Sequence, residues 1–568
     1  MQNGEPSSPT FDMKAPVSIF QYYTLSFQIE KMKKSRLPKT FIFSITVINF
    51  LFVSFLQSQN IIDAFLIGNN TTILRGTQQD GLITPRDLDF HKDANRQNEL
   101  WVINEGGTPY GNNTQYIETV CIPQNSNVTF TIYDSYGDGI CCSFGNGSYN
   151  VNVCGVTVTS GGNFGSQEST SFNVSTCDDA CAENEVEVVI SILTDNYGGE
   201  TSWDIVDDDN STVYGMHADA GGSTVTYYNA GQDNQWAEYR KDSFSGHFMH
   251  TASAIAMSEN GTFANTLDCQ DANDNANGYF TGCTLWDSDT TIYARVNQNG
   301  PLLGSHIDMI HQSPYSEGIA SAGGNVYWLF DGYHNAICKY DFGAPHQHGG
   351  DDHSDGRVWR HADVVVEKVP GLSSHMEIDP VSGWLYIADT GNERILRMDP
   401  NSGQIAQSLD PYGETLQGYW RMSGTDWEVV ADSNMTYPTG LDIYDNRLLV
   451  SDYANGDIIV YDITQNPVVE LGRIETGLSN EIMGLKISPE GAIWYVCSNA
   501  NELYQITTMF MGDLNGDGNY NIVDVLLCVQ FVMGLADLEE NELNRADVNY
   551  DGVIDVFDVL LIVDLILD

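Results

Sequence analysis

Basic residues are scarce in this chain of 568 residues. Lysine and arginine together number 24, against 77 aspartates and glutamates, and the formal net charge at pH 7 is −53. Nucleic acids and anionic membrane surfaces are bound through basic patches. The composition therefore argues against either of them as a partner. It favours an extracellular, cation-rich setting for an acidic, solvated surface.

Familiar catalytic motifs are also missing. The sequence contains no Gly-x-Ser-x-Gly, no His-Glu-x-x-His and no phosphate-binding loop. Beyond the N-terminal region, no stretch is long and apolar enough to span a membrane. What the chain does contain is 53 glycines and 11% aromatic residues, a composition typical of a β protein with many turns. We therefore expect a mainly β fold.

The N-terminal region has the layout of a secretory signal. An apolar run at residues 40–56 follows basic residues at positions 33, 34, 36 and 39, and polar residues come directly after it. Met32 is the natural start of such a signal, so residues 1–31 are interpreted as a mis-called extension. The alternative is an uncleaved membrane anchor. We assign residues 1–60 to the signal and its extension, and predict a secreted protein with no stable membrane span after cleavage.

The cysteines are unevenly distributed. Six of the 11 fall between Cys121 and Cys181, and Cys269 and Cys283 bracket one short loop. Because no Cys-x-x-Cys pair has a matching histidine set, this clustering in an exported chain predicts disulfides rather than zinc.

An internal repeat organises the middle of the chain. Each copy has a small or acidic residue, alternating apolar positions, a tight turn and an aromatic-rich strand, which is the pattern of a β-hairpin. The six copies begin at Pro85, Ala252, Ser316, His375, Pro438 and Ile482. The later copies lie roughly 44 to 64 residues apart, the size of a four-stranded propeller blade. The predicted fold is a six-bladed β-propeller; a β-sandwich is the alternative.

The segment at residues 379–403, DPVSGWLYIADTGNERILRMDPNSG, resembles an NHL-type repeat, and the whole array resembles six-bladed NHL-like propellers. The propeller is assigned to residues 61–106 and 223–508. Residues 65–75 are expected to supply the fourth strand of the last blade and so close the ring. Some propellers of this kind are metal-dependent lyases or lactonases, so the resemblance leaves catalysis open.

Residues 107–222 interrupt the first blade between its second and third strands. They carry the cysteine cluster and two related halves, and are predicted to form a disulfide-rich, duplicated β insert. Asp134 and Asp138 lie in a glycine-rich segment of the first half. They are interpreted as tight-turn residues, with calcium binding as the alternative.

Two 12-residue segments near the C-terminus, 513–524 and 547–558, have the spacing of EF-hand loops. Oxygen-bearing side chains stand at loop positions 1, 3, 5, 9 and 12, a backbone carbonyl serves at position 7, and glycine stands at position 6. The predicted ligands are Asp513, Asn515, Asp517, Asn519, Asn521 and Asp524 in the first loop, and Asp547, Asn549, Asp551, Val553, Asp555 and Asp558 in the second. The sequence therefore predicts two bound Ca²⁺ ions in a small helical domain.

The loops recur 34 residues apart, end in Asp rather than Glu, and lead into apolar helices; in these features residues 512–568 resemble a type I dockerin. The resemblance implies docking onto a cohesin in an extracellular assembly, often one that degrades polysaccharides. Loop positions 10 and 11 help to select the cohesin, and here they are the apolar Ile522, Val523, Val556 and Phe557. A cohesin-like partner is therefore a hypothesis, and a structural C-terminal clamp is the alternative.

Histidines recur in the propeller region. His306, His311 and His375 precede repeat strands and are expected at one mouth of the channel, where they would hold Zn²⁺ or a similar divalent metal with Asp308 or Glu377. The alternative is that they hydrogen-bond within loops. The tract HQHGGDDHSDG at residues 346–356 is expected on the opposite face as a separate candidate for surface metal binding.

Two functions remain open. The favoured one is a non-catalytic propeller that binds a glycan or a protein and is delivered by the calcium module. The alternative is a metal-dependent propeller hydrolase or lyase, directed at a polysaccharide or a small ester, with its site at the channel mouth. Because propellers serve both functions, the fold alone cannot choose between them.

Overall fold

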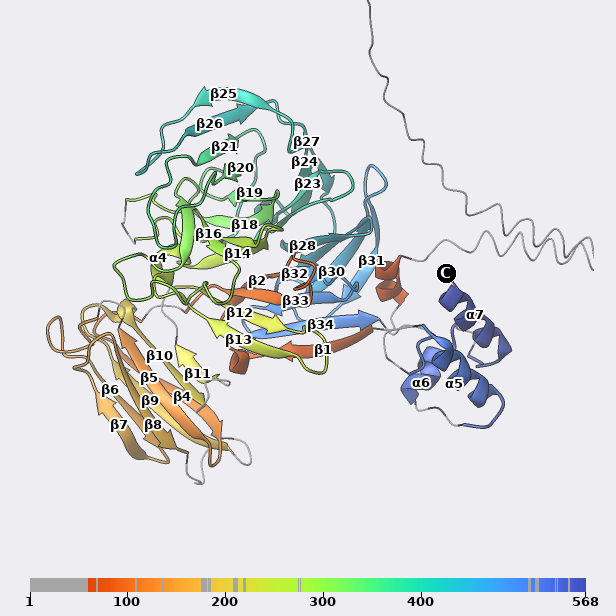
Figure 1. Cartoon of the computed structure of the whole chain (residues 1–568). Helices are drawn as coiled ribbons and strands as arrows, with labels where there is room; N and C mark the ends of the chain where they lie inside the picture. The colour runs from red at the N-terminus through yellow and green to blue at the C-terminus, as the bar shows by residue number, and fades with distance from the viewer. Residues whose placement is uncertain are drawn as a thin grey trace, which may run out of the picture. The chain divides into compact units, whose positions relative to one another are not determined.

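The structure is a computed structural model of the chain. It describes residues 60–567, with gaps at 68–69, 108–109, 135–136, 175–180, 182–184, 208–212, 218–220, 274, 276, 509–511, 516–519, 537, 539 and 550–551. Residues 61–568 form one compact unit. The apolar run at 40–56 lies outside the described residues. The fold is mainly β, with a small helical region at the C-terminus (Figure 1).

Within the described residues, six sheets follow one another along the chain, and each contains four antiparallel strands in the same order. The first is β2 (Pro85–Phe90), β3 (Leu100–Asn104), β12 (Ser223–Tyr228) and β13 (Trp236–Arg240). The second is β14 (Ala252–Met257), β15 (Thr262–Leu267), β16 (Cys283–Asp287) and β17 (His306–Ile310). The third is β18 (Ser316–Ser321), β19 (Val326–Asp331), β20 (Ala336–Asp341) and β21 (Arg357–His361).

The remaining three sheets repeat this order. The fourth is β22 (Met376–Ile378), β23 (Leu385–Asp389), β24 (Arg394–Met398) and β27 (Trp427–Ala431). The fifth is β28 (Pro438–Tyr444), β29 (Arg447–Asp452), β30 (Asp457–Asp462) and β31 (Val469–Glu475). The sixth is β32 (Ile482–Ile487), β33 (Ile493–Cys497), β34 (Glu502–Thr508) and β1 (Asn70–Gly76). The second strand of the sixth sheet, β33, is buried throughout, which explains its unbroken apolar sequence.

The first strands of the six sheets are neighbours in turn. β2 contacts β14, and the series continues through β18, β22, β28 and β32 back to β2. Glycine permits this close approach: a Cβ at Gly318 would lie 1.9 Å from the Ser374 carbonyl oxygen, and one at Gly484 would lie 2.7 Å from Asp87 Cα. Both distances are shorter than any real contact, so side chains are excluded at these positions.

The sixth sheet takes its fourth strand from the start of the described chain. β1 pairs antiparallel with β34, from Asn70 opposite Thr508 onward, which confirms the predicted fourth strand of this sheet. The strand begins at residue 70 rather than 65, because residues 61–67 form the short helices α3 (Ile61–Ala64) and η1 (Phe65–Ile67). Ile62 and Phe65 are buried in the core between the fifth and sixth sheets, and this burial removes them from the strand.

The third sheet is larger than the repeat predicts. β26 (Gly418–Ser423) pairs parallel with β21, and β25 (Gln404–Ser408) pairs with β26, so the sheet has six strands. The chain then supplies β27 to the fourth sheet. The segment between β24 and β27 thus extends a neighbouring sheet before it completes its own.

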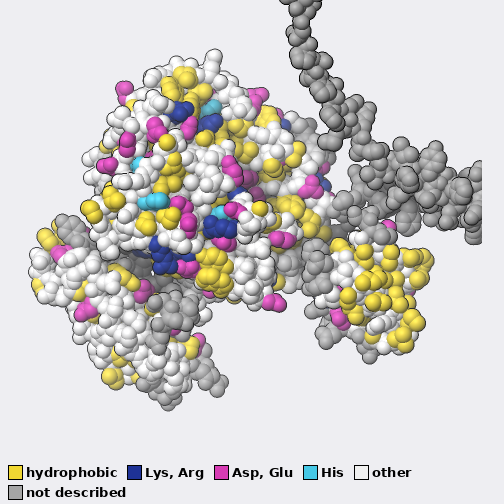
Figure 2. All heavy atoms as spheres, in the orientation of Figure 1, with side chains coloured by type: hydrophobic (Ala, Val, Ile, Leu, Met, Phe, Trp, Pro, Cys, Tyr) yellow, Lys and Arg dark blue, Asp and Glu magenta, His cyan; other side chains and the backbone are white. Residues whose placement is uncertain are grey.

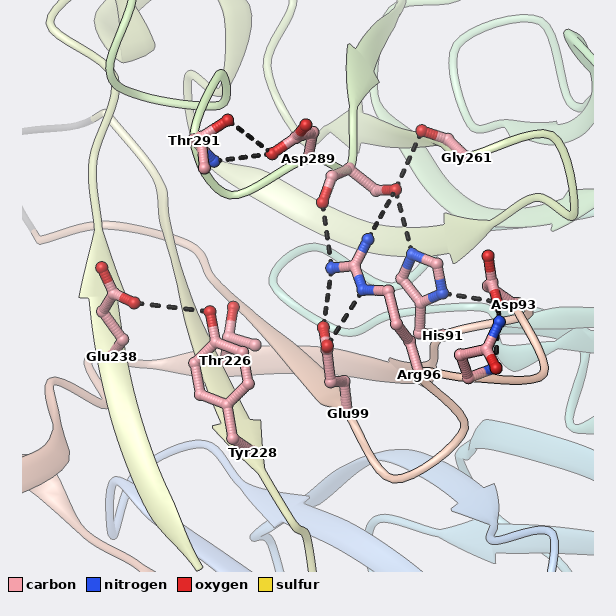
Figure 3. Close-up of polar contacts among 12 residues, drawn as sticks. His91, Asp93, Arg96, Glu99, Thr226, Tyr228, Glu238, Gly261, Asp289 and Thr291 are labelled. Atoms are coloured by element: carbon pink, nitrogen blue, oxygen red, sulfur yellow. Dashed lines mark hydrogen bonds and ion pairs between the residues drawn. The ribbon is translucent and has the colours of Figure 1, made fainter.

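Polar contacts also join adjacent sheets at the turn that follows β2 (Figure 3). The Arg96 guanidinium donates to both carboxylate oxygens of Glu99, at 2.9 and 2.6 Å, and to the Ser288 carbonyl at 3.1 Å. His91 Nε2 lies 3.0 Å from the Ser288 hydroxyl, which itself donates to the Gly261 carbonyl. His91 therefore ties the first sheet to the second.

Residues 115–217 contain two further four-stranded sheets. One is formed by β4 (Gln115–Pro123), β9 (Glu185–Leu193), β6 (Ser148–Val153) and β7 (Val156–Gly161). The other is formed by β11 (Val213–His217), β10 (Thr201–Asp207), β5 (Asn127–Asp134) and β8 (Gln167–Asn173). One apolar core, containing Phe130, Ile190 and Trp203, is shared between them. The short helices η2 (Gln78–Asp80), η3 (Gly198–Glu200), α4 (Ser245–Phe248) and η4 (Thr390–Asn392) lie in connections.

Disulfides are present among the clustered cysteines. Cys121 bonds to Cys181, Cys141 bonds to Cys142, and Cys154 is also disulfide-bonded. A disulfide across the loop that begins at Cys269 is wrong, because Cys283 is a buried free thiol. Cys283 is the first residue of β16, and it packs there as a small apolar side chain of the core.

The helical region consists of α5 (Ile522–Val532), α6 (Glu540–Ala546) and α7 (Val556–Leu567). α5 packs against α7, and the core between the helices contains Leu514, Cys528 and Ile562. Among the described residues, no helix has the length and apolar character needed to cross a membrane.

Candidate functional sites

The two C-terminal loops are closed by the same hydrogen bonds. In the first loop, Asp524 Oδ1 accepts from the Asn515 amide at 3.2 Å, and Oδ2 accepts from the Asn521 amide at 2.9 Å. In the second, Asp558 accepts from the amides of Asn549 at 3.3 Å and Asp555 at 2.8 Å. Position 12 thus binds positions 3 and 9 in both loops. Asp524 and Asp558 are fully buried.

Position 9 of each loop also caps the helix that begins at the next residue. Asn521 Oδ1 accepts from the Val523 amide at 2.8 Å, and Asp555 Oδ1 accepts from the Phe557 amide at 2.7 Å. These contacts satisfy amide groups that the first turn of a helix leaves without a partner. Gly552 has a φ of +79°, as loop position 6 requires, and its amide donates to Asp547 at 2.8 Å.

The structure describes only some of the other predicted calcium ligands. Asp513 is buried at the head of the first loop. Asp517, Asn519 and Asp551 lie outside the described residues. The described part of each loop nevertheless buries its last carboxylate, and the first loop also buries Asp513. A hard oxygen-binding cation would neutralise these groups.

Each helix that follows a loop exposes apolar side chains at matching positions. Ile522 is 64% exposed and Phe557 62% exposed. The pairs separated by 34 residues are Ile522 with Val556, Val523 with Phe557, Leu526 with Leu560, and Val532 with Ile566. Figure 2 shows these helices covered with hydrophobic side chains. We call the four pairs the duplicated apolar face. Such a concentration on a small module indicates a docking surface.

A second candidate site lies at β17, the edge strand of the second sheet. Asp308, His346 and His353 each offer one metal-ligating atom, and these atoms lie within 4.8 Å of one another. Asp308 Oδ1 is 2.8 Å from His353 Nδ1. The rings of His306 and His346 are 5.0 Å apart, and those of His311 and His353 are 5.8 Å apart.

The pKa values of the side chains in this cluster depend on their burial and on the negative charge of Asp308. Burial lowers the pKa of His306 to about 3, and the neighbouring His346 contributes to that shift. Burial also opposes the charged form of His353, but the hydrogen bond and negative charge of Asp308 outweigh it and raise the pKa of His353. Burial in turn raises the pKa of Asp308. The cluster thus holds two imidazoles whose pKa is lowered, His306 and His346, and one, His353, whose protonated form is favoured by Asp308.

The location of the 346–356 tract corrects a prediction. The tract was expected on the face opposite His306 and His311, but its backbone bonds to β17: His346 N donates to the Ile307 carbonyl at 3.0 Å and Gly349 N to the His306 carbonyl at 2.8 Å. The reason is that the β20–β21 connection is long enough to reach the unpaired edge of the neighbouring sheet.

The structure does not bring His375 to this cluster. His375 directly precedes β22 of the fourth sheet, and its Nδ1 lies 3.2 Å from Oδ1 of Asp87 on β2. Burial, together with the positive charge of Lys486, lowers the pKa of His375 to about 3. Glu377, the other carboxylate considered for the predicted site, is paired with Lys486. Of the three predicted histidines, His306 and His311 therefore share a neighbourhood and His375 occupies another.

Charged side chains, some buried and some partly exposed, line the cavity around His375. Asp87, Asp89, Lys92, Glu377 and Lys486 all face it. Their hydrogen bonds are structural: Asp87 Oδ2 accepts from the Ile255 amide at 2.9 Å, and Asp89 Oδ2 from the Met257 amide at 2.8 Å. Each of these bonds joins the first strands of two adjacent sheets.

Two further sequence hypotheses can be located. Asp134 Oδ1 accepts from the Gly137 amide at 2.5 Å, which is the tight turn that was expected. Asp134 also converges with Asp138 and Glu200, and burial and Asp134 raise the pKa of Glu200 to about 7. Trp328 and Trp494 are buried in the core.

Comparison with known proteins identifies the C-terminal part. Residues 511–567 match the model of the dockerin type I domain, a calcium-binding module that docks onto cohesins in extracellular or cell-surface proteins. No curated protein matches the chain.

Solved structures align only loosely. An auxiliary nutrient binding protein from Bacteroides ovatus aligns at 12% identity over 69% of this chain and 98% of its own, with a TM-score of 0.30. One from Bacteroides thetaiotaomicron aligns at 12% identity over 70% and 95%, also at 0.30. A nidogen–laminin complex aligns at 15% identity over 50% and 86%, at 0.31. At these scores the alignments support no conclusion about function.

Proposed function

We propose that this protein is a secreted component of an extracellular assembly, in which the C-terminal dockerin module binds a cohesin and carries a six-bladed, NHL-like β-propeller. The proposal assigns residues 1–60 to export, 61–106 and 223–508 to the propeller, 107–222 to the insert and 512–568 to the dockerin. The observation that carries it is the duplication in the module. Both loops are closed by the same hydrogen bonds, and both helices expose apolar side chains at matching positions.

The propeller part of the proposal is supported by the order of the sheets. The first strands of the six sheets contact one another in sequence, and the last contacts the first. β1 supplies a strand from the opposite end of the chain to the sixth sheet. This arrangement supports a closed ring, because the last sheet takes its strands from both ends of the described β region.

The docking surface is proposed to be the duplicated apolar face. Ile522, Val523, Val556 and Phe557 stand at the loop positions that select a cohesin, and all four are exposed. Apolar residues at the centre of an interface contribute most of the binding energy when water is excluded from them. We therefore expect a cohesin whose complementary surface is apolar.

Isothermal titration calorimetry of the full chain against type I cohesin domains tests this proposal. We expect binding in excess Ca²⁺ and none after chelation. Val523→Asp with Phe557→Asp should weaken binding at least 100-fold. Leu535→Asp, at an apolar position that is 71% exposed outside the duplicated face, is the matched control and should bind normally. Calcium-loaded protein that binds no cohesin would contradict docking and favour the C-terminal clamp.

The propeller is proposed to bind a glycan or a protein. A cavity of about 230 Å³ is lined by the amide side chains of Asn98, Gln232 and Gln505, which are suited to sugar hydroxyl groups. A glycan array probed with the full chain, and with Gln232→Ala, tests this role; equal binding by both would contradict it.

The alternative, a metal-dependent hydrolase or lyase, would require a bound metal at the Asp308 cluster.

A further inference from the structure

We propose that Asp308, His346 and His353 form a binding site for one divalent transition metal, of which Zn²⁺ is the best fit. The three residues come from two sheets: Asp308 is on β17, and both histidines are in the connection between β20 and β21. Their ligand atoms lie within 4.8 Å of one another, so a single ion can reach all three. Two imidazoles and one carboxylate are a ligand set that zinc and neighbouring transition metals prefer.

Unsatisfied polar atoms point to a missing ligand. Asp308 is 1% exposed, yet its Oδ2 is buried and has no hydrogen-bond partner among the described residues. The same holds for the buried Nε2 of His346 within the described part of the chain. A buried carboxylate oxygen and a buried ring nitrogen that lack partners each destabilise the fold. A cation between them would coordinate both atoms and remove that penalty.

The surrounding contacts prepare the ligands. His346 Nδ1 lies 2.7 Å from the Gln347 carbonyl, to which it can only donate, so the lone pair of the neutral ring is left on Nε2. The Met309 amide donates to Asp308 Oδ1 at 2.8 Å and orients the carboxylate. Hydrogen bonds of this kind fix the tautomer and direction of metal ligands.

The loop that carries the histidines is anchored near them. His346 N and Gly349 N bond to the backbone of β17, and the His306 ring stacks on Phe248 with centroids 3.6 Å apart. The ligand positions are therefore held by a strand edge and an aromatic contact. An ion here would join the second sheet to the third.

His311 lies near the site but is not a proposed ligand, because both of its ring nitrogens have partners of their own. His311 Nδ1 is 2.9 Å from Glu414, and its Nε2 is 3.4 Å from His247. His353 is the reverse case: its single strong partner is Asp308 at 2.8 Å, itself a proposed ligand. Metal binding would replace the proton that these two side chains share, and that proton would be released to solvent.

Zinc titration of chelator-treated protein in saturating Ca²⁺ tests the site, because calcium keeps the C-terminal loops occupied. We expect one Zn²⁺ per chain, and one Co²⁺ with the intense visible bands of a tetrahedral site. Asp308→Asn, His346→Ala and His353→Ala should each weaken zinc binding at least tenfold. His348→Ala, in the same loop but outside the cluster, is the matched control and should bind as the wild type does.

Thermal melting gives an independent measurement. Zinc should raise the melting temperature of the wild type and the control, since a ligand that binds only the folded state stabilises it. It should not raise that of His346→Ala, in which a half-buried side chain is removed and folding is expected to persist. The proposal is overturned if the calcium-loaded wild type binds no zinc, or if Asp308→Asn with His346→Ala still binds one ion with unchanged affinity.

Discussion

Lys486 offers a direct test of how buried charge holds the first strands together. Its side chain on β32 is 11% exposed and contacts Glu377 on β22 and Asp442 on β28, the latter at 3.5 Å. The two carboxylates oppose the burial penalty and raise the pKa of Lys486 well above its usual value, so the ammonium group stays charged. Lys486→Met would retain the apolar stem and remove the charge.

The expected loss of stability depends on the charged groups that stay buried in the Lys486→Met variant. Glu377 and Asp442 would be left as partly or fully buried carboxylates without their cation, and breaking a buried ion pair from one side costs about 3–5 kcal/mol. Replacing all three groups should cost less, because no charge is then left buried. We expect Lys486→Met with Glu377→Gln and Asp442→Asn to recover at least half of the lost stability.

The loss should also depend on pH. Burial raises the pKa of Asp442 to about 6 even though Lys486 opposes the shift, and removal of Lys486 should raise it further. A carboxyl group with a raised folded-state pKa binds a proton more readily folded than unfolded, so acid stabilises the folded variant. The difference between wild type and Lys486→Met should therefore be smaller at pH 5 than at pH 8.

Urea unfolding followed by tryptophan fluorescence, in excess Ca²⁺, measures these differences. Arg295→Met is the control: its ion pair with Glu238 at 2.6 Å has an arginine side chain that is 57% exposed. An exposed pair contributes about 0–1 kcal/mol, so this variant should unfold close to the wild type. If Lys486→Met loses less than about 1 kcal/mol at pH 8, or loses equally at both pH values, the reasoning is refuted.

Three further perturbations have defined outcomes. Asp524→Ala with Asp558→Ala should abolish calcium binding by residues 512–568 and make this segment protease-sensitive while the β domains stay intact; unchanged proteolysis would show that the loops fold without calcium. His361, whose pKa burial lowers to about 4, takes up a proton on unfolding between pH 6.5 and 4. From pH 7.5 to 5 the wild type should therefore lose about 2 kcal/mol more stability than His361→Gln in urea titrations, and parallel losses would contradict this. Gly318→Ala should lower the melting temperature by several degrees, because the new methyl group meets the Ser374 carbonyl; an unchanged melting temperature would mean that β18 and β22 can separate.

Local sequence determined the calcium loops and the hairpins. All predicted ligands of one loop lie within 12 residues, so the spacing alone predicts the loop. Asp524 and Asp558 close the two loops as that spacing requires. Strand periodicity and turns likewise placed the meanders that begin at Pro85, Ser316 and Pro438. These features depend on contacts between near neighbours in the chain.

Only the tertiary structure decided which distant side chains meet. Asp308 is on a strand of the second sheet and His353, 45 residues later, is in a connection of the third. Their contact depends on how far that connection reaches along the edge of β17. His375 resembles His306 in sequence context, yet it is buried beside Asp87. Cys283 is a core thiol because its strand is covered on both faces. Hydrophobic periodicity specifies which face of a strand is buried, but the packing of complete sheets determines which buried residues touch.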